Sequence, residues 1–114
     1  MPAPQADAAR FPYELTIARH TEDGSEILSL GGEIDLASGP ALQRALLDAE
    51  RSMPRRLVLD LAGLGFLDST AIHLLLDAQE RAEAKGHQLI LTHVPAYAER
   101  LFELTGIRAR LTIE

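Results

Sequence analysis

Two hydroxyl side chains stand beside a carboxylate where an apolar run gives way to an apolar helical pattern. Asp68, Ser69 and Thr70 follow Phe66-Leu67 and precede Ala71-Ile72. The first turn of a helix carries unpaired N–H groups and positive partial charge, so Asp68 can cap a helix whose first turn holds Ser69 and Thr70. A phosphoryl group there would be tolerated by the fold and felt by a bound protein. The pattern predicts a phosphorylation switch on a small binding domain, with a plain helix cap as the competing interpretation.

A second loop carries acidic residues after a strand-like segment. It reads Gly31-Gly32-Glu33-Ile34-Asp35-Leu36. If the strands before the two loops are neighbours, Asp35 lies near Asp68. A helix-entry cap is the alternative role for Asp35, and the spacing alone gives no distance between the two carboxylates.

His73 follows Ser69 by one helical turn and raises the question of nucleophilic catalysis. A triad needs a base that is oriented by a third group, whereas Asp68 is better placed to cap backbone N–H groups. The sequence has no Gly-x-Ser-x-Gly elbow, phosphate loop or dinucleotide fingerprint. Its four histidines lack the paired spacing of a metal site. We therefore expect no catalytic residue, no metal and no cofactor.

Composition narrows the class of protein. The 114 residues suffice for one domain with a single core. A net charge of -6 argues against a nucleic-acid partner, and no apolar run is long enough to insert into a membrane. The chain lacks cysteine, which excludes thiolate sites and permits the reducing cytoplasm, where we expect the protein. Residues 1–12 have no apolar centre and are expected to form a flexible tail before a domain of residues 13–114.

Short extended segments alternate with amphipathic ones from residue 13 onward. Residues 13–18 and 27–30 flank a turn and predict a β-hairpin. A helix is expected from Ser38-Gly39-Pro40, followed by a strand at 56–61 whose continuous apolar run predicts cover on both faces. A helix over 69–85 completes this half, with Gly86 as its C-terminal stop.

The remaining segment continues the alternation. Residues 87–94 predict a strand, and Pro95 opens a helix that ends at Gly106 with Leu104 among its inward residues. Residues 108–113 predict a last short strand. Helical crossovers make the later strands parallel, so the sequence predicts an α/β domain with helices packed on a sheet.

Three motifs together resemble one known family over most of the chain. Leu30-Gly31-Gly32-Glu33-Ile34-Asp35 is similar to a Gly-Glu-hydrophobic-Asp loop, and Phe66-Leu67-Asp68-Ser69-Thr70 is similar to a phosphorylated Asp-Ser-Ser/Thr-Gly motif. Arg100-Leu101-Phe102-Glu103-Leu104-Thr105-Gly106-Ile107 resembles an Arg-Leu-Phe-x-hydrophobic-Ser/Thr-Gly helix end. The chain resembles a STAS domain of the bacterial anti-sigma-factor antagonist family.

The resemblance implies a mixed four- to five-stranded sheet with about three helices packed on one side, and no catalytic activity. Family members bind an anti-sigma factor that is also a serine kinase and thereby free a sigma factor for transcription. The kinase modifies the hydroxyl after the motif Asp, here Ser69 with Thr70 as the alternative, and a PP2C-type phosphatase reverses the modification. By the same resemblance, Asp35 and Asp68 belong to the partner surface.

The chain departs from the family at two positions near the hydroxyl pair. Ala71 and His73 stand where the family usually has glycine, and His73 adds bulk to the expected partner surface. The sequence stops at Glu114, directly after the last predicted strand, where many relatives continue into a further helix. The oligomeric state is left open.

Two alternatives to the single-kinase switch remain. The first is a STAS module within a stress-signalling scaffold or a lipid-transport complex. The second is a small hydrolase that uses Ser69 and His73.

Overall fold

In the described part of the chain, five strands form one mixed sheet. The computed structural model describes residues 14–114, so the predicted tail at 1–12 lies outside the described residues. The strands lie in chain order and only the first pair is antiparallel. Their bounds are β1 Thr16–Glu22, β2 Ser25–Ile34, β3 Arg56–Leu67, β4 Gln88–Thr92 and β5 Thr112–Ile113. The predicted hairpin is confirmed, and its turn at Asp23 and Gly24 has positive φ at both residues, as tight hairpin turns require.

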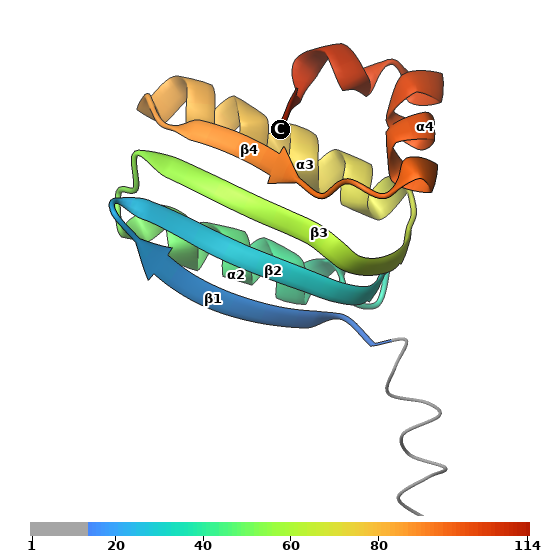
Figure 1. Ribbon diagram of the computed structural model, residues 1–114, viewed down its shortest axis with the longest axis horizontal. Helices are drawn as coiled ribbons and strands as arrows, with labels where there is room; N and C mark the ends of the chain where they lie inside the picture. Colours follow the sequence, from blue (N-terminus) through green and yellow to red (C-terminus); the bar gives the residue numbers. More distant parts are fainter. Residues whose placement is uncertain (1–13) are drawn as a thin grey trace, which may run out of the picture.

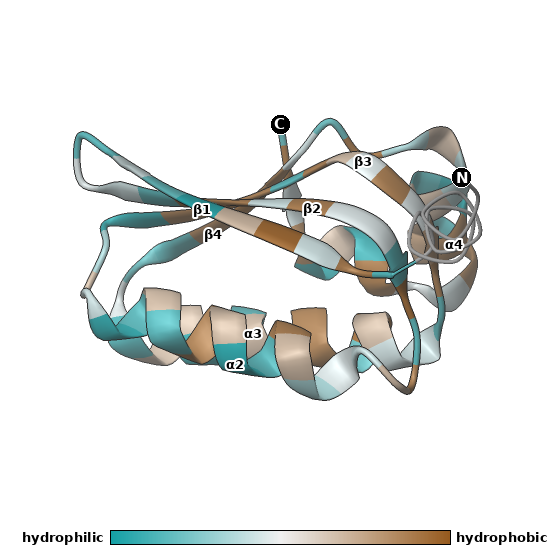
Figure 2. Ribbon diagram, turned by 90° about the horizontal axis from the view of Figure 1, so that it is seen from below, coloured by the Kyte–Doolittle hydropathy of each residue, from teal (hydrophilic) through white to brown (hydrophobic). Residues whose placement is uncertain are grey.

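Within residues 14–114, three α-helices accompany the sheet. They are α2 Gly39–Arg51, α3 Ser69–Lys85 and α4 Ala96–Thr105, and a short 3₁₀ helix, η2, spans Ile107–Arg110. Figure 2 shows α2 and α3 side by side beneath one face of the sheet. In Figure 1, α4 lies at the end of the sheet where β4 finishes. The predicted class, a mixed α/β sheet with about three helices, is confirmed.

The core lies between the sheet and the helix pair. The fully buried side chains are mainly leucines; Leu28, Leu59 and Leu91 of β2, β3 and β4 form one cluster with leucines of α2 and α3. Val58 and Asp60 alternate with these leucines and are only half-buried. The prediction that this strand is covered on both faces is therefore wrong, because α2 and α3 pack on one face only.

Three other predicted details are wrong. β3 runs to Leu67 and not to residue 61, and β5 holds only two residues because η2 occupies Ile107–Arg110. Leu104 is 75% exposed, although it was expected to point inward. Leu104 lies about 120° and about 160° around α4 from Ala98 and Phe102, the two buried residues of this helix.

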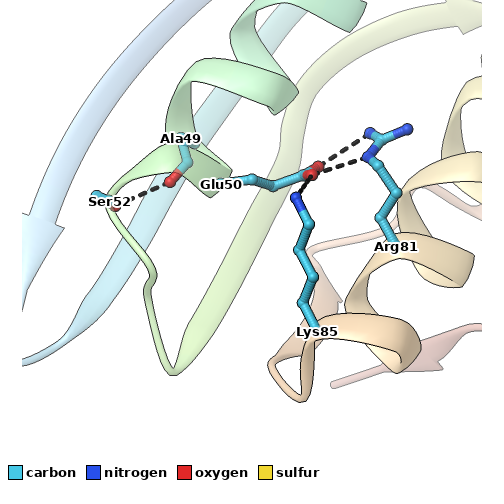
Figure 3. A network of polar contacts seen from close by, with 5 residues as sticks. All are labelled: Ala49, Glu50, Ser52, Arg81 and Lys85. Atoms are coloured by element: carbon cyan, nitrogen blue, oxygen red, sulfur yellow. Dashed lines mark hydrogen bonds and ion pairs between the residues drawn. The ribbon is translucent and has the colours of Figure 1, made fainter.

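An ion-pair network joins the C-terminal ends of α2 and α3 (Figure 3). Glu50 is 3% exposed, and its two carboxylate oxygens accept hydrogen bonds of 2.8 and 2.9 Å from Nε and an Nη atom of Arg81. Lys85 Nζ lies 3.8 Å from the same carboxylate. This network holds the two helices together at one end of the layer.

Candidate functional site

The two acidic loops meet at the carboxyl end of β2 and β3. Ile34 and Leu67 are paired in the parallel ladder, so Asp35 and Asp68 are the residues that follow two partners. The backbone N–H of Asp68 donates to the carbonyl of Ile34 at 3.2 Å. The condition set by the sequence, that the two strand ends be neighbours, is met. Ligands of open α/β sheets bind at this end of parallel strands.

Two β-bulges allow β3 to reach this point. The β2–β3 register shifts between Ser29 and Gly31 and again between Gly32 and Glu33, and each shift leaves an extra residue on β3. Gly31 lies opposite Gly63, and a Cβ added to Gly63 would lie 3.4 Å from the Cα of Gly31. Close backbone approach at this glycine pair keeps the strands together through the bulged segment, which ends at the site.

Asp68 caps α3 as predicted. It is extended, with φ -121° and ψ -166°, and its Oδ1 accepts a 2.8 Å hydrogen bond from the N–H of Thr70. Its carbonyl accepts bonds from the N–H groups of Ala71 and Ile72. The cap fixes Ser69 as the first residue of the helix.

The two neighbouring hydroxyls differ in their surroundings. Ser69 is exposed, whereas Thr70 is half-buried. A Cβ on Gly39 would lie only 2.8 Å from Thr70 Cγ2, so Thr70 packs against the first turn of α2. Ser69 is thus the accessible hydroxyl of the pair.

Asp35 organises the loop that enters α2. Its Oδ1 accepts from the N–H of Ser38 at 3.0 Å and from the Ser38 hydroxyl at 3.1 Å. These hydrogen bonds lower the pKa of the Asp35 carboxyl, and the bond from the backbone N–H of Ser38 has the larger effect. The Asp35 side chain is therefore a carboxylate at neutral pH. It lies at the same end of the sheet as Asp68 and Ser69, and we call the region of these three residues the corner.

Two further acidic side chains lie beside Asp35. A hollow of about 460 Å³ opens beside the loop, and its charged lining residues are Glu14, Glu33 and Asp35. Ala41 in the first turn of α2 also lines the hollow, so the positive end of that helix lies beside these carboxylates. A phosphoryl group on Ser69 would add to the negative charge of this corner.

His73 is exposed and lies one turn after Ser69. Among residues 14–114 no hydrogen bond joins Ser69 to His73, and the Asp68 carboxylate is engaged by the cap. The described part of the chain also holds no group of three or more side chains suited to a metal ion. The structure does not assemble Ser69, His73 and Asp68 as a triad.

Exposed apolar side chains near the carboxyl ends of β2, β3 and β4 were missed by the sequence reasoning. Leu36 is 79% exposed and Phe66 is 45% exposed, and Tyr97 at the start of α4 is 38% exposed. The Tyr97 hydroxyl donates to the carbonyl of Leu64 at 3.0 Å; burial, with a contribution from Glu33, raises its pKa. We call Leu36, Phe66 and Tyr97 the apolar rim. The glycines at 63 and 65 were the available signal for the bulges that expose Phe66.

Comparison with known proteins identifies the class. Residues 17–113 match the family described as "Mlab, STAS domain". The chain therefore belongs to the STAS domain family. No helix within residues 14–114 has the length and apolar character needed to cross a membrane.

Similar proteins of this family carry anti-sigma-factor antagonist names. The anti-sigma-F factor antagonist RsfB of Mycobacterium tuberculosis is 34% identical over 70 residues, which are 61% of this chain and 57% of that protein. The match thus spans little more than half of that relative. The anti-sigma-B factor antagonist of Staphylococcus aureus is 27% identical over 94 residues, covering 82% of this chain and 87% of that protein.

Solved structures share the fold. An anti-sigma factor antagonist from Mycobacterium paratuberculosis has a TM-score of 0.80 at 26% identity, covering 90% of this chain and 86% of that one. Unphosphorylated SpoIIAA, also described as an anti-sigma factor antagonist, has a TM-score of 0.71 at 18% identity, with 89% and 88% covered, and shows the fold alone.

Proposed function

We propose that this chain is an anti-sigma-factor antagonist that binds an anti-sigma factor with serine kinase activity and thereby releases a sigma factor. Phosphorylation of Ser69 ends the binding, and a PP2C-type phosphatase restores it. The observation that carries the proposal is the exposed Ser69 at the first position of α3, between the Asp68 cap and the Asp35 loop. The names of the relatives support the antagonist class.

The modification adds charge without rebuilding the fold. The Ser69 Oγ forms a bond to the γ-phosphorus of ATP, the bond from that phosphorus to the bridging oxygen breaks, ADP leaves and the hydroxyl proton goes to solvent. Phosphatase action uses water to break the Oγ–P bond and yields inorganic phosphate. Because Ser69 is exposed, the phosphoryl group displaces no core side chain.

The added charge of about -1.5 to -2 acts on the docked partner. Asp35, Asp68 and Glu33 already make the corner acidic. A further anion that is desolvated at a protein interface costs several kcal/mol, which corresponds to a loss of affinity of about a hundredfold or more. The apolar rim supplies contact area beside the charge, and His73 lies on the same surface.

The test measures binding to the anti-sigma factors of the source organism, each purified and titrated by calorimetry. Ser69→Ala should bind one of them with the affinity of the unmodified chain and resist phosphorylation by it. Ser69→Asp should bind at least tenfold more weakly. Equal affinity of the Asp and Ala variants would contradict the mechanism.

A matched control tests whether the position of the added negative charge matters. Ser29 is also an exposed serine, but it lies in the middle of β2, away from the site. Ser29→Asp carries the same added charge and should bind like the wild type. Intact mass and peptide mapping of protein from its own cells should place one phosphate on Ser69 and not on Thr70.

A second candidate is a STAS module in a larger assembly, either a stress-signalling scaffold or a lipid-transport complex. The name Mlab in the matched family description favours keeping it. Such a module should co-purify with a large complex at fixed stoichiometry, whereas the proposed antagonist should exchange with a single kinase. A hydrolase based on Ser69 and His73 would be labelled at Ser69 by a fluorophosphonate, and we expect no labelling.

A further inference from the structure

We propose that His73 forms part of the phosphorylation site, as the counter-cation of a phosphoryl group on Ser69. The inference rests on the proposed modification of Ser69 and adds a residue that holds the modified state.

The spacing in α3 places the two side chains together. Ser69 and His73 are four residues apart and both are exposed. Side chains at this spacing share one face of a helix, with Cβ atoms about 5–6 Å apart. Helical side chains also lean toward the N-terminus, so the ring of His73 lies over the turn that carries Ser69. The phosphoryl oxygens extend beyond Oγ toward the same space.

His73 is available for this contact in the described part of the chain. No hydrogen bond or ion pair within residues 14–114 engages its ring, whereas His20 and His93 lie 3.2 and 3.1 Å from the carboxylates of Glu22 and Asp60. The Asp68 carboxylate accepts from the Thr70 N–H and is held on the helix end. His73 is therefore the imidazole that a phosphoryl group on Ser69 would meet.

Other charged groups near α3 are mostly engaged elsewhere. Asp77, four residues beyond His73, is the competing anion on the same face of the helix, and Glu80 faces Arg110 of η2 at 4.0 Å. Glu50 pairs with Arg81 and Lys85, and Asp48 pairs with Arg51. The remaining charged residues on α3 and on the elements packed against it are Glu83, Arg44, Arg56, Asp60 and Arg108; β4 contributes none.

The phosphoryl group itself reports the contact. A phosphoserine passes from one to two negative charges near pH 6. A neighbouring imidazolium favours the dianion, so it lowers the midpoint of that second ionisation. For an exposed pair at this spacing, the expected lowering is about 0.2–0.4 pH unit.

The test uses the full chain with phosphoserine installed genetically at position 69. The midpoint of its ³¹P chemical-shift titration is measured at low ionic strength in the wild type, His73→Gln and His73→Arg. We expect a midpoint about 0.2–0.4 unit higher in His73→Gln than in the wild type, and His73→Arg should bring it back down. Added salt should reduce the difference, because the pair is exposed.

His20→Gln is the matched control. His20 is also exposed and contacts a carboxylate, but it lies near the β1–β2 turn at the opposite end of the sheet. This variant should leave the ³¹P midpoint unchanged. Equal midpoints in the wild type and His73→Gln would overturn the inference. Since the phosphoserine is installed without a kinase, that result leaves the proposed function standing, and absence of phosphate on Ser69 in cells would instead defeat the proposed function.

Discussion

Removing the guanidinium of Arg81 tests how α2 and α3 are held together. In Arg81→Met, the buried Glu50 carboxylate loses both short hydrogen bonds and keeps only Lys85 Nζ at 3.8 Å. Loss of one partner of a buried ion pair costs about 3–5 kcal/mol, because a charge is left without compensation. The Arg81 side chain is 25% exposed, so water can take part of its place. We expect the free energy of unfolding to fall by about 2–3 kcal/mol.

Urea unfolding followed by far-UV circular dichroism at pH 7 measures this loss. The double variant Glu50→Leu/Arg81→Met leaves no buried charge between α2 and α3 and should lie within about 1 kcal/mol of the wild type. Lys85→Met is the control, since the Lys85 side chain is 51% exposed and should cost less than about 1 kcal/mol. A double variant as unstable as Arg81→Met would refute the reasoning, because the unpaired charge would then not be the cause.

Three further predictions concern the site and the helix ends. Gly39→Ala sets a methyl group 2.8 Å from Thr70 Cγ2, so chemical unfolding should show a loss of about 1–2 kcal/mol that Thr70→Ser recovers in the double variant. Asp68→Ala removes the cap of α3 and should cost about 1 kcal/mol in the same assay, most of which Asp68→Asn avoids. Burial lowers the pKa of His87 although Glu50 opposes the shift, so the unfolded chain gains this proton near pH 6.5 and the native state only at lower pH. Stability measured by thermal unfolding should therefore fall as the pH drops below about 6.5, and less so in His87→Gln.

The α/β alternation and the main helix were predictable because their signals are local. Asp68 and Gly86 bound α3 as expected, the first as a side-chain cap and the second with φ 81° in the left-handed region. Hydrophobic periodicity does not depend on distant residues, so it placed the hairpin and β4 as well. The family motifs added the class, which the match over residues 17–113 confirms.

The end of β3 was not predictable in this way. Its last six residues contain Gly63 and Gly65, which are typical of a loop when the segment is considered alone. The segment stays in the sheet because Gly31 pairs with Gly63 and Gly32 pairs with Leu64, between two bulges. That pairing joins residues about thirty positions apart and exposes Phe66 beside the site.

The sequence by itself determined which side chains stand at the proposed site: a capping carboxylate, two hydroxyls behind it, and a histidine one turn along. Only the tertiary structure decided between the hydroxyls, because the close approach of Gly39 to Thr70 comes from packing α2 against α3. It also brought Asp35 to the same corner through the pairing of Ile34 with Leu67. Caps and periodicity act within a few residues, whereas exposure and the meeting of two loops depend on which elements become neighbours in the folded chain.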